Sequence, residues 1–245
     1  MMEKVYKQDI RLSHIHTDRF GRLTPAALLY LVQEVSGDHC HLLGADGDAL
    51  GKPFWAISRT KVEVAQLPKL GQTLTLETWP MPTTRVAYPR SVVAYDKNHN
   101  ELFRSISLWV LMDDRTRSMI LPGKSGVMVD GTITGLELAV PHAIATRPMD
   151  NQRTRTVGFS LLDCNGHMNN TRYMNWVDDL LPAAFHRDHP ITELTLCYLS
   201  EAREGQFLEL SWELPQPDTL QVDAHREKTD VPGQKERIFS AKIGV

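Results

Sequence analysis

The sequence predicts an α+β protein made of two related halves, each with one long helix packed on an antiparallel sheet. Three observations lead to this prediction. A motif occurs twice along the chain, each copy precedes a segment with helical spacing of apolar residues, and each such segment precedes four runs of alternating apolar and polar residues. A helix with an apolar side must bury it, and the inner face of the sheet is the surface available.

The repeat has two parts that occur in the same order in both halves. The pattern Asp-x-x-Gly begins at Asp18 and again at Asp163, an offset of 145 residues (163 − 18). Further along, the pattern Gly-Gln-x-Leu-x-Leu begins at Gly71 and again at Gly205, an offset of 134 residues (205 − 71). Two shared patterns in one order indicate a tandem fusion of two related domains.

The segment between the two halves contains recurring Gly and Pro residues, which are typical of a connection. We therefore predict an N-terminal domain over 1–130, a linker over 131–150 and a C-terminal domain over 151–245.

In the first half, a strand over 4–12 is predicted to precede a helix. Thr24 suits the N-cap of that helix and Pro25 suits its first position. The apolar residues that follow share one helical face: Leu28, Leu31, Val32 and Val35. Alternation then predicts strands in four runs: 60–66, 72–79, 90–96 and 102–112.

The second half repeats this order. A strand over 154–162 is predicted to precede a helix over 169–180, with Asn169 or Asn170 as its cap and Pro182 as its end or a kink. Four apolar residues have helical spacing: Tyr173, Trp176, Val177 and Leu180. The predicted strands that follow are 193–199, 206–213, 219–225 and 236–243.

Composition excludes several classes of protein. The 245-residue chain has a net charge of −3 with histidine neutral, which gives no bulk attraction to nucleic acid. Its three cysteines do not suggest a disulfide framework. No apolar stretch approaches the ~20 residues of a membrane helix, and the first residues lack the apolar core of a signal peptide. We expect a cytoplasmic protein, monomeric or homodimeric, without a nucleic-acid or membrane partner.

Two histidine pairs raise the question of a metal site. His14 and His16 can share a strand face, whereas His39 and His41 point apart on a helix. No partner pair at ligand spacing follows either of them. We expect no metal and no other cofactor.

The stretch LLDCNGHMNN (161–170) concentrates acid, amide and imidazole side chains before the second predicted helix. On an extended backbone alternate side chains project to one side, so Asp163, Asn165 and His167 would converge. The amides that open the helix suit a developing oxyanion. Together these groups predict acyl transfer to water. The alternative is a polar turn in which Asp and Asn are caps and Gly166 permits the turn.

The first half separates these interpretations. The Asp, the Gly and a capping residue occur in both copies of the motif, which indicates a structural role. Phe20 and Arg22 occupy the positions of Asn165 and His167. We therefore interpret Asn165 and His167 as functional.

The longer motif LLDCNGHMNNTRYMNWVDD resembles the signature of the fatty acyl-ACP thioesterases of bacteria and plant plastids, which are tandem hotdog proteins. The family pattern D-x-N-x-H-x-N-N-x-x-Y-x-x-W begins at Asp163, and Glu201 matches an acid that the family carries in the following strand region. The run FWAISRTKVEV (54–64) resembles the family's opening central strand. The resemblance covers about residues 5–244 and implies a tandem double hotdog that hydrolyses fatty acyl-ACP to free fatty acid.

The resemblance also implies one active site per chain, in the second half. Its catalytic set is Asp163, Asn165, His167 and Glu201. Glu201 and His167 are the candidates for the base that activates water. Asn165 would hold the water or the carbonyl, and Asp163 would orient its neighbours through its charge or through backbone contacts.

The remaining assignments concern substrate binding. Asn169 and Asn170 are predicted to bind substrate, and the amides at the start of the helix over 169–180 to polarise the carbonyl. In the first half Leu67 aligns with Glu201, so that half lacks the catalytic set and is expected to bind the acyl chain. The implied partner is acyl carrier protein.

A cysteine nucleophile is not expected. Many plant members of the family carry Cys directly after the matching Glu, but this chain has Ala202 there. Cys164 lies inside the motif at a variable position. Hydrolysis by activated water is therefore the preferred mechanism.

Three other functions remain open. An acyl-CoA thioesterase would use the same chemistry with a site for the CoA nucleotide. A hotdog dehydratase or hydratase would act at the β-carbon of the acyl chain. A non-catalytic module would bind acyl thioesters, although the complete set of four residues in one half argues against it.

Overall fold

The computed structural model of the chain describes residues 4–45, 53–228, 230–231 and 233–245. The chain divides into two compact units, 1–141 and 142–245. Residues of the segment predicted as a linker pack on both units. Trp79 in the first unit donates a hydrogen bond to Glu137 (2.9 Å), and Gln221 in the second donates one to the carbonyl oxygen of Ala145 (2.9 Å).

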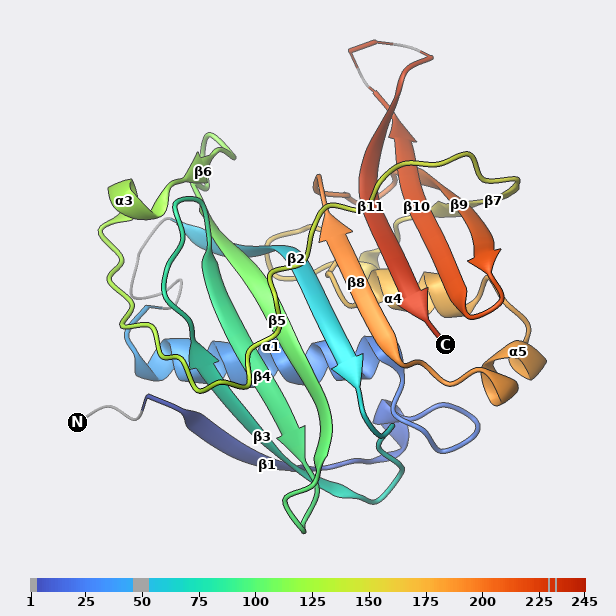
Figure 1. Cartoon of the computed structure of the whole chain (residues 1–245). Helices are drawn as coiled ribbons and strands as arrows, with labels where there is room; N and C mark the ends of the chain where they lie inside the picture. The colour runs from blue at the N-terminus through green and yellow to red at the C-terminus, as the bar shows by residue number, and fades with distance from the viewer. Residues whose placement is uncertain (1–3, 46–52, 229, 232) are drawn as a thin grey trace. The chain divides into compact units, whose positions relative to one another are not determined.

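The first unit contains an antiparallel sheet in the order β1-β3-β4-β5-β2, with the short β6 paired to β5. Helix α1 lies across one face of this sheet (Figure 1). The elements are β1 (Tyr6–Arg11), η1 (His14–His16), α1 (Pro25–Leu42), β2 (Phe54–Val64), β3 (Thr73–Pro80), β4 (Tyr88–Tyr95), β5 (Glu101–Met112), β6 (Met119–Ile120) and α3 (Pro122–Ser125).

Helix α1 begins where the sequence predicts. The hydroxyl of Thr24 accepts a hydrogen bond from the backbone N–H of Ala27 (3.1 Å), and Pro25 is the first helical residue. The apolar residues of the predicted face are all at most 1% exposed: Leu28, Leu31, Val32 and Val35. Burial of this face holds the helix on the sheet.

The second unit repeats this sheet order as β7-β9-β10-β11-β8, again antiparallel. Its elements are β7 (Asn151–Thr156), η2 (Phe159–Leu161), α4 (Arg172–Asp178), α5 (Ala183–Asp188), β8 (Glu193–Tyr198), β9 (Phe207–Gln216), β10 (Thr219–Glu227) and β11 (Lys235–Gly244).

Even the register of the edge strands repeats. Arg11 pairs with Thr73 in the first unit, and their counterparts at the two offsets, Thr156 and Phe207, pair in the second. The tandem repeat inferred from the sequence is therefore a structural repeat, and each unit is an α+β domain.

The helix predicted over 169–180 is shorter than expected. The side-chain oxygen of Asn169 accepts hydrogen bonds from the backbone N–H (2.9 Å) and hydroxyl (2.7 Å) of Thr171, so a turn precedes α4. Helix α4 ends at Asp178, and Pro182 caps the separate helix α5. Tyr173 stacks on Phe239 of β11, with ring centroids 4.5 Å apart, and joins α4 to the sheet. Among the described residues, no helix is long and apolar enough to span a membrane.

Candidate active site

Residues 163–167 form a tight turn rather than an extended segment. The backbone N–H of Asp163 donates to the carbonyl oxygen of His167 (2.7 Å), and the N–H of Gly166 donates to that of Asp163 (3.0 Å). Gly166 has a φ of 75°, which a residue with a side chain would adopt only with strain. The expectation of an extended backbone with alternating side chains is therefore wrong for this stretch.

The carboxylate of Asp163 stabilises this turn. Its Oδ1 accepts hydrogen bonds from the backbone N–H groups of Asn165 (2.9 Å) and His167 (3.1 Å). The position of the His167 main chain thus depends on the carboxylate of Asp163.

The first unit contains the same turn around Asp18. Its Oδ1 accepts from the backbone N–H groups of Phe20 (2.8 Å) and Arg22 (2.9 Å), and the N–H of Gly21 donates to its carbonyl oxygen (3.0 Å). The shared Asp and Gly therefore have the structural role that the sequence comparison assigned to them.

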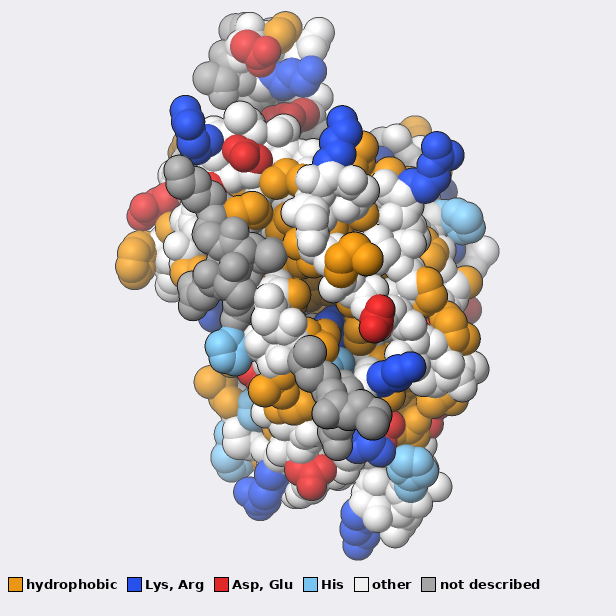
Figure 2. Space-filling model, turned by 90° about the vertical axis from the view of Figure 1, so that its left-hand side faces the viewer, with side chains coloured by type: hydrophobic (Ala, Val, Ile, Leu, Met, Phe, Trp, Pro, Cys, Tyr) orange, Lys and Arg blue, Asp and Glu red, His pale blue; other side chains and the backbone are white. Residues whose placement is uncertain are grey.

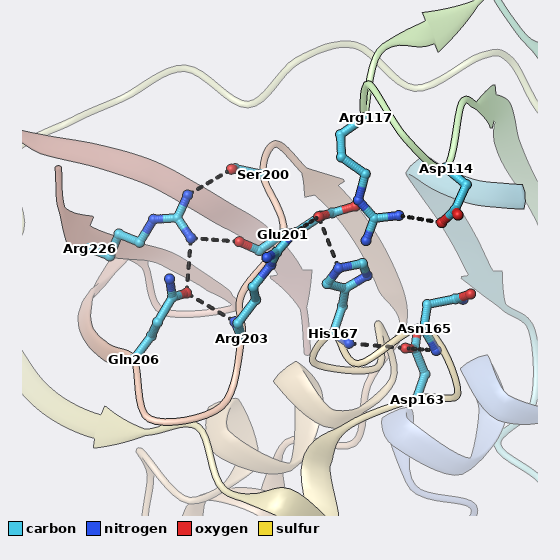
Figure 3. A network of polar contacts seen from close by, with 10 residues as sticks. All are labelled: Asp114, Arg117, Asp163, Asn165, His167, Ser200, Glu201, Arg203, Gln206 and Arg226. Carbon is cyan, nitrogen blue, oxygen red and sulfur yellow. Dashed lines mark hydrogen bonds and ion pairs between the residues drawn. The ribbon is translucent and has the colours of Figure 1, made fainter. Parts of the chain in front are cut away.

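His167 and Glu201 form the central contact of the site. The Nε2 atom of His167 lies 3.0 Å from Oε2 of Glu201. Figure 3 shows the two side chains facing each other, with Asp163 and Asn165 on the turn beside His167. The backbones also meet, because His167 forms a β-bridge with Arg203 and the N–H of Met168 donates to the carbonyl oxygen of Ala202 (2.8 Å). These contacts bring the motif and the loop after β8 together.

Burial distinguishes the two members of this pair. The side chain of His167 is 9% exposed, whereas that of Glu201 is 32% exposed. An ionised carboxylate only accepts hydrogen bonds, so Nε2 of His167 is the donor. The carboxylate of Glu201 is therefore partly accessible to solvent, and the buried imidazole of His167 donates a hydrogen bond to it.

Arginine side chains surround Glu201 and were not identified from the sequence. Nη2 of Arg203 lies 3.5 Å from Oε2 of Glu201. Arg226 of β10 donates from Nη1 to the carbonyl oxygen of Glu201 (2.7 Å) and from Nη2 to the hydroxyl of Ser200 (3.1 Å). Arg226 also donates to the side-chain oxygen of Gln206 (2.9 Å), so it spans the loop after β8.

The register of the strands, once known, identifies Arg226 as a residue held in place. It pairs across β10 and β11 with Glu236, and their side chains form an ion pair at 2.6 Å. Opposite charges at facing positions in two strands are a recognisable pattern once the register is known. The register was not known from the sequence alone.

The three asparagines of the motif have different environments. Asn165 is exposed, and its side-chain amide has no hydrogen-bond partner within the part of the chain that the structure describes. Asn169 uses its oxygen in the turn before α4. The carbonyl oxygen of Asn170 accepts a hydrogen bond from the hydroxyl of Tyr198 (3.1 Å). Of the three, Asn165 is the exposed one, whereas Asn169 and Asn170 are half-buried.

The backbone amides that open α4 differ in position from those expected to polarise the carbonyl. The helix has seven residues and starts at Arg172, three residues after the predicted start. Its dipole is correspondingly small. Burial raises the pKa of the nearby Tyr173, so its phenol stays protonated and cannot act as a base.

The corresponding place in the first unit contains no acid–imidazole pair. Arg22 replaces His167 and binds Asp18 through Nη2 (3.1 Å), and its guanidinium lies 4.7 Å from the ring centroid of Phe20. Leu67 replaces Glu201. The first unit retains the turn but not the chemical groups.

None of the three cysteines occupies the position directly after Glu201, where a cysteine nucleophile would be expected. Cys164 is exposed on the turn, and Cys197 is buried in β8. Ala202, which follows Glu201, is 1% exposed. No thiol therefore stands directly after the acid of the site.

Two family models match the chain in order. The acyl-ACP thioesterase N-terminal domain matches residues 3–121, and the acyl-ACP thioesterase C-terminal domain matches residues 146–239. The second of these includes His167 and Glu201.

Several curated relatives of the chain are chloroplastic proteins. A chloroplastic acyl-[acyl-carrier-protein] hydrolase of Cuphea viscosissima is 26% identical over 220 residues, which cover 82% of this chain and 52% of the relative. A chloroplastic dodecanoyl-[acyl-carrier-protein] hydrolase of Cinnamomum camphora is 26% identical over 217 residues, covering 82% of this chain and 56% of the relative. The chain thus spans about half the length of the curated relatives that it matches.

Solved structures share the fold along the whole chain. An acyl-ACP thioesterase from Bacteroides thetaiotaomicron has a TM-score of 0.84 at 22% identity, covering 98% of this chain and 97% of that one. The 12:0-ACP thioesterase of Umbellularia californica has a TM-score of 0.81 at 21% identity, covering 100% and 98%. The likeness supports the double hotdog fold.

Proposed function

Because the chain belongs to the acyl-ACP thioesterase family, we propose that it hydrolyses the thioester of a fatty acyl-ACP and releases the free fatty acid and the carrier protein. The names of the curated relatives support this activity, since they are hydrolases of acyl-carrier-protein thioesters.

The observation that carries the proposal is the contact between His167 and Glu201. The 3.0 Å distance between Nε2 and Oε2 puts a general base and a group that orients it in one place. The same place in the first unit holds Arg22 and Leu67, which cannot perform this chemistry. Catalysis is therefore assigned to the second unit.

Glu201 is the base that activates water in this mechanism. Its carboxylate is partly exposed, whereas His167 is buried and donates from Nε2. As a water oxygen forms a bond to the thioester carbonyl carbon, one water proton passes to Glu201. The tetrahedral intermediate then collapses, the C–S bond breaks, and the leaving sulfur takes up a proton to give the carrier's thiol. The other product is the fatty acid.

The surrounding groups have supporting roles. The exposed amide of Asn165 is placed on the motif turn, where it can donate to the thioester carbonyl or hold the water. Asp163 fixes the backbone of that turn. Asn169 and Asn170 are assigned to substrate binding next to the turn, and the first unit is assigned to binding of the acyl chain. No step in this scheme needs a cofactor.

A turnover assay on the purified chain tests the proposal. Acyl-ACPs of eight to eighteen carbons are compared with acyl-CoAs of the same chains, and both free thiol and free fatty acid are measured. We expect equal amounts of the two products and a higher kcat/KM for acyl-ACP. A higher kcat/KM for acyl-CoA would assign the CoA ester as substrate, and enoyl product without thiol would indicate a dehydratase.

A further inference from the structure

A cavity of about 180 Å³ lies within the first unit between α1 and the sheet. Hydrophobic side chains surround a hollow on the face shown in Figure 2. The walls of the cavity include Gly37 and Cys40 of α1, Trp55 of β2, Tyr88 and Arg90 of β4, and Trp109 of β5. An apolar wall of this kind suits a methylene chain.

Arg90 is the exception in this wall. It is 8% exposed and lies in β4, a strand in which every residue is buried. Burial lowers the pKa of Arg90 to about 10, which leaves its guanidinium charged at neutral pH. Among the described residues it has no carboxylate partner.

The two described partners of Arg90 are both neutral, and both contact the same nitrogen of the guanidinium, Nη1. Nη1 lies 3.0 Å from Nδ1 of His39 and donates to the hydroxyl of Thr78 (3.3 Å). Because arginine only donates, Nδ1 of His39 is the acceptor and that imidazole is neutral. Thr78 in turn donates to the carbonyl oxygen of Ser91 (2.9 Å).

The rest of the guanidinium remains available to a ligand. Within the described part of the chain, Nε and Nη2 of Arg90 donate no hydrogen bond. Arg90 is one of the residues that line the cavity, so we place these two nitrogens at the cavity wall. The indole Nε1 of Trp109, another residue of this wall, is enclosed and also lacks an acceptor among the described residues. Among the described residues, the wall of the cavity thus contains donors for which the structure gives no acceptor.

We propose that this cavity receives an acyl chain that carries a hydrogen-bond-accepting oxygen beyond the thioester, and that Arg90 selects it. The inference rests on the proposed function, which assigns the acyl chain to the first unit. The apolar wall contacts the methylene groups, and Nε and Nη2 of Arg90 donate to a hydroxyl, keto or carboxylate oxygen. A plain hydrocarbon chain would leave these donors unpaired, which is unfavourable in an apolar site.

Binding to a slow variant separates this inference from turnover. Glu201→Gln keeps the shape of the site, and S-acyl-N-acetylcysteamine thioesters serve as probes. They are plain, hydroxylated, keto-bearing or ω-carboxylated, with eight to sixteen carbons. Trp55 and Trp109 line the cavity, so quenching of intrinsic fluorescence reports binding alongside calorimetry. We expect at least one oxygenated series to bind tenfold or more tightly than the plain chains of equal length.

The Arg90 variants identify the residue responsible. Glu201→Gln/Arg90→Met should lose the preference without losing affinity for plain chains, and Glu201→Gln/Arg90→Lys should keep part of it. Arg59 of β2 donates to the carbonyl oxygen of Pro141 (3.2 Å) and does not line the cavity, so Arg59→Met is the matched control and should keep the preference.

Each outcome decides the inference. Plain chains that bind as tightly as every oxygenated series, a preference that survives Arg90→Met, or no binding at all would overturn it. If Arg90→Met does not fold, the comparison of probes on Glu201→Gln and on the Lys variant still decides. Turnover of plain acyl-ACP by the unmodified chain would leave the proposed function standing in any of these cases, and no turnover of any thioester would remove both.

Discussion

Nη1 of Arg226 lies 2.7 Å from the carbonyl oxygen of Glu201, so a strand residue holds the main chain of the proposed base. The same guanidinium contacts Ser200 and Gln206, which lie on either side of Glu201 in the loop. Its charge is balanced by Glu236 rather than by Glu201. Arg226 is therefore a positioning residue for the loop after β8.

Arg226→Met should reduce kcat at least tenfold with a smaller change in KM, because the loop would no longer hold Glu201 against His167. Arg226→Lys should restore part of kcat, since one ammonium can replace only some of these hydrogen bonds. Steady-state kinetics and thermal unfolding of each variant measure both effects.

Arg237 provides the matched control. Its side chain is 22% exposed against 18% for Arg226, and it donates to the carbonyl oxygen of Ile144 (3.1 Å) and pairs with Asp223 (3.6 Å) rather than with Ser200, Glu201 or Gln206. Arg237→Met should therefore lower Tm without a comparable fall in kcat. Equal losses of kcat in Arg226→Met and Arg237→Met would show that Arg226 contributes only to stability and does not position Glu201.

Replacement of the central pair tests the chemistry itself. Glu201→Gln keeps the shape of the side chain but removes the carboxylate, and His167→Ala removes the donor to it. Each should cost about 10²-fold or more in kcat, the usual scale for general acid–base groups. Circular dichroism checks folding, and single-turnover assays with acyl-ACP measure the chemical step. Near-normal turnover by a folded Glu201→Gln would exclude that carboxylate as the base.

The cysteines should be dispensable. Cys164 is exposed on the turn, and no cysteine follows Glu201. Cys164→Ala should keep most of the activity, and so should the triple Ala variant of Cys40, Cys164 and Cys197 if it folds. Turnover after treatment with a thiol-alkylating reagent gives a second measurement. Loss of activity in a folded Cys164→Ala would revive a thiol nucleophile.

The repeat explains why the strands were predictable and the loop contacts were not. Alternating residues and the two sequence offsets identify the strands of each unit, and the Thr24 cap identifies the start of α1. The start of α4 was misplaced because Asn169 bonds to Thr171 locally, which competes with helix formation. Sequence patterns do not identify Arg226, because its loop partners lie twenty to twenty-six residues earlier, at no fixed spacing.

The proposed site was predictable for a similar reason. A motif unique to one copy of a repeat identifies His167, and the family resemblance adds Glu201. Their 3.0 Å contact depends on the bridge between His167 and Arg203, which only the fold supplies.

Glu137 should make the first unit sensitive to acid. Burial opposes its ionisation, but hydrogen bonds from Thr134 and Trp79 outweigh that effect and lower the pKa of Glu137 to about 2. Because this folded-state pKa lies below the ordinary value of 4.5, the stabilisation is present above pH 4.5 and declines as the pH falls toward 2. Thermal unfolding at pH 7, 5 and 3 measures the decline.

Glu137→Gln isolates this contribution, since all other carboxylates are common to both proteins. We expect the variant to be less stable at pH 7 by roughly 2 kcal/mol, the scale of hydrogen bonds to a charged group. The difference in unfolding free energy between the unmodified chain and Glu137→Gln should be smaller at pH 3. A difference that stays constant from pH 7 to pH 3 would show that the charge of Glu137 does not contribute to stability.

The two turns allow the structural and functional roles of the motif to be separated. Asp163→Ala removes the acceptor of the Asn165 and His167 N–H groups, and Asp18→Ala removes that of Phe20 and Arg22. Each change should cost on the order of 1–3 kcal/mol of unfolding free energy, because polar backbone groups lose their partner. Denaturant unfolding measures this cost for both variants.

Activity should respond to only one of the two changes. Asp163 fixes the main chain of His167, so Asp163→Ala should displace the imidazole from Glu201 and lower kcat tenfold or more. Asp18→Ala affects a turn whose Arg22 has no counterpart of Glu201 to contact, since Leu67 stands in that place, and kcat should stay within about twofold of the unmodified chain. The pair is informative because the backbone hydrogen bonds of the two turns match, and Asp18 has the Arg22 guanidinium as an additional partner. If kcat fell equally in Asp163→Ala and Asp18→Ala, the effect of Asp163→Ala would be explained by the loss of stability. Displacement of His167 would then not be needed to explain it.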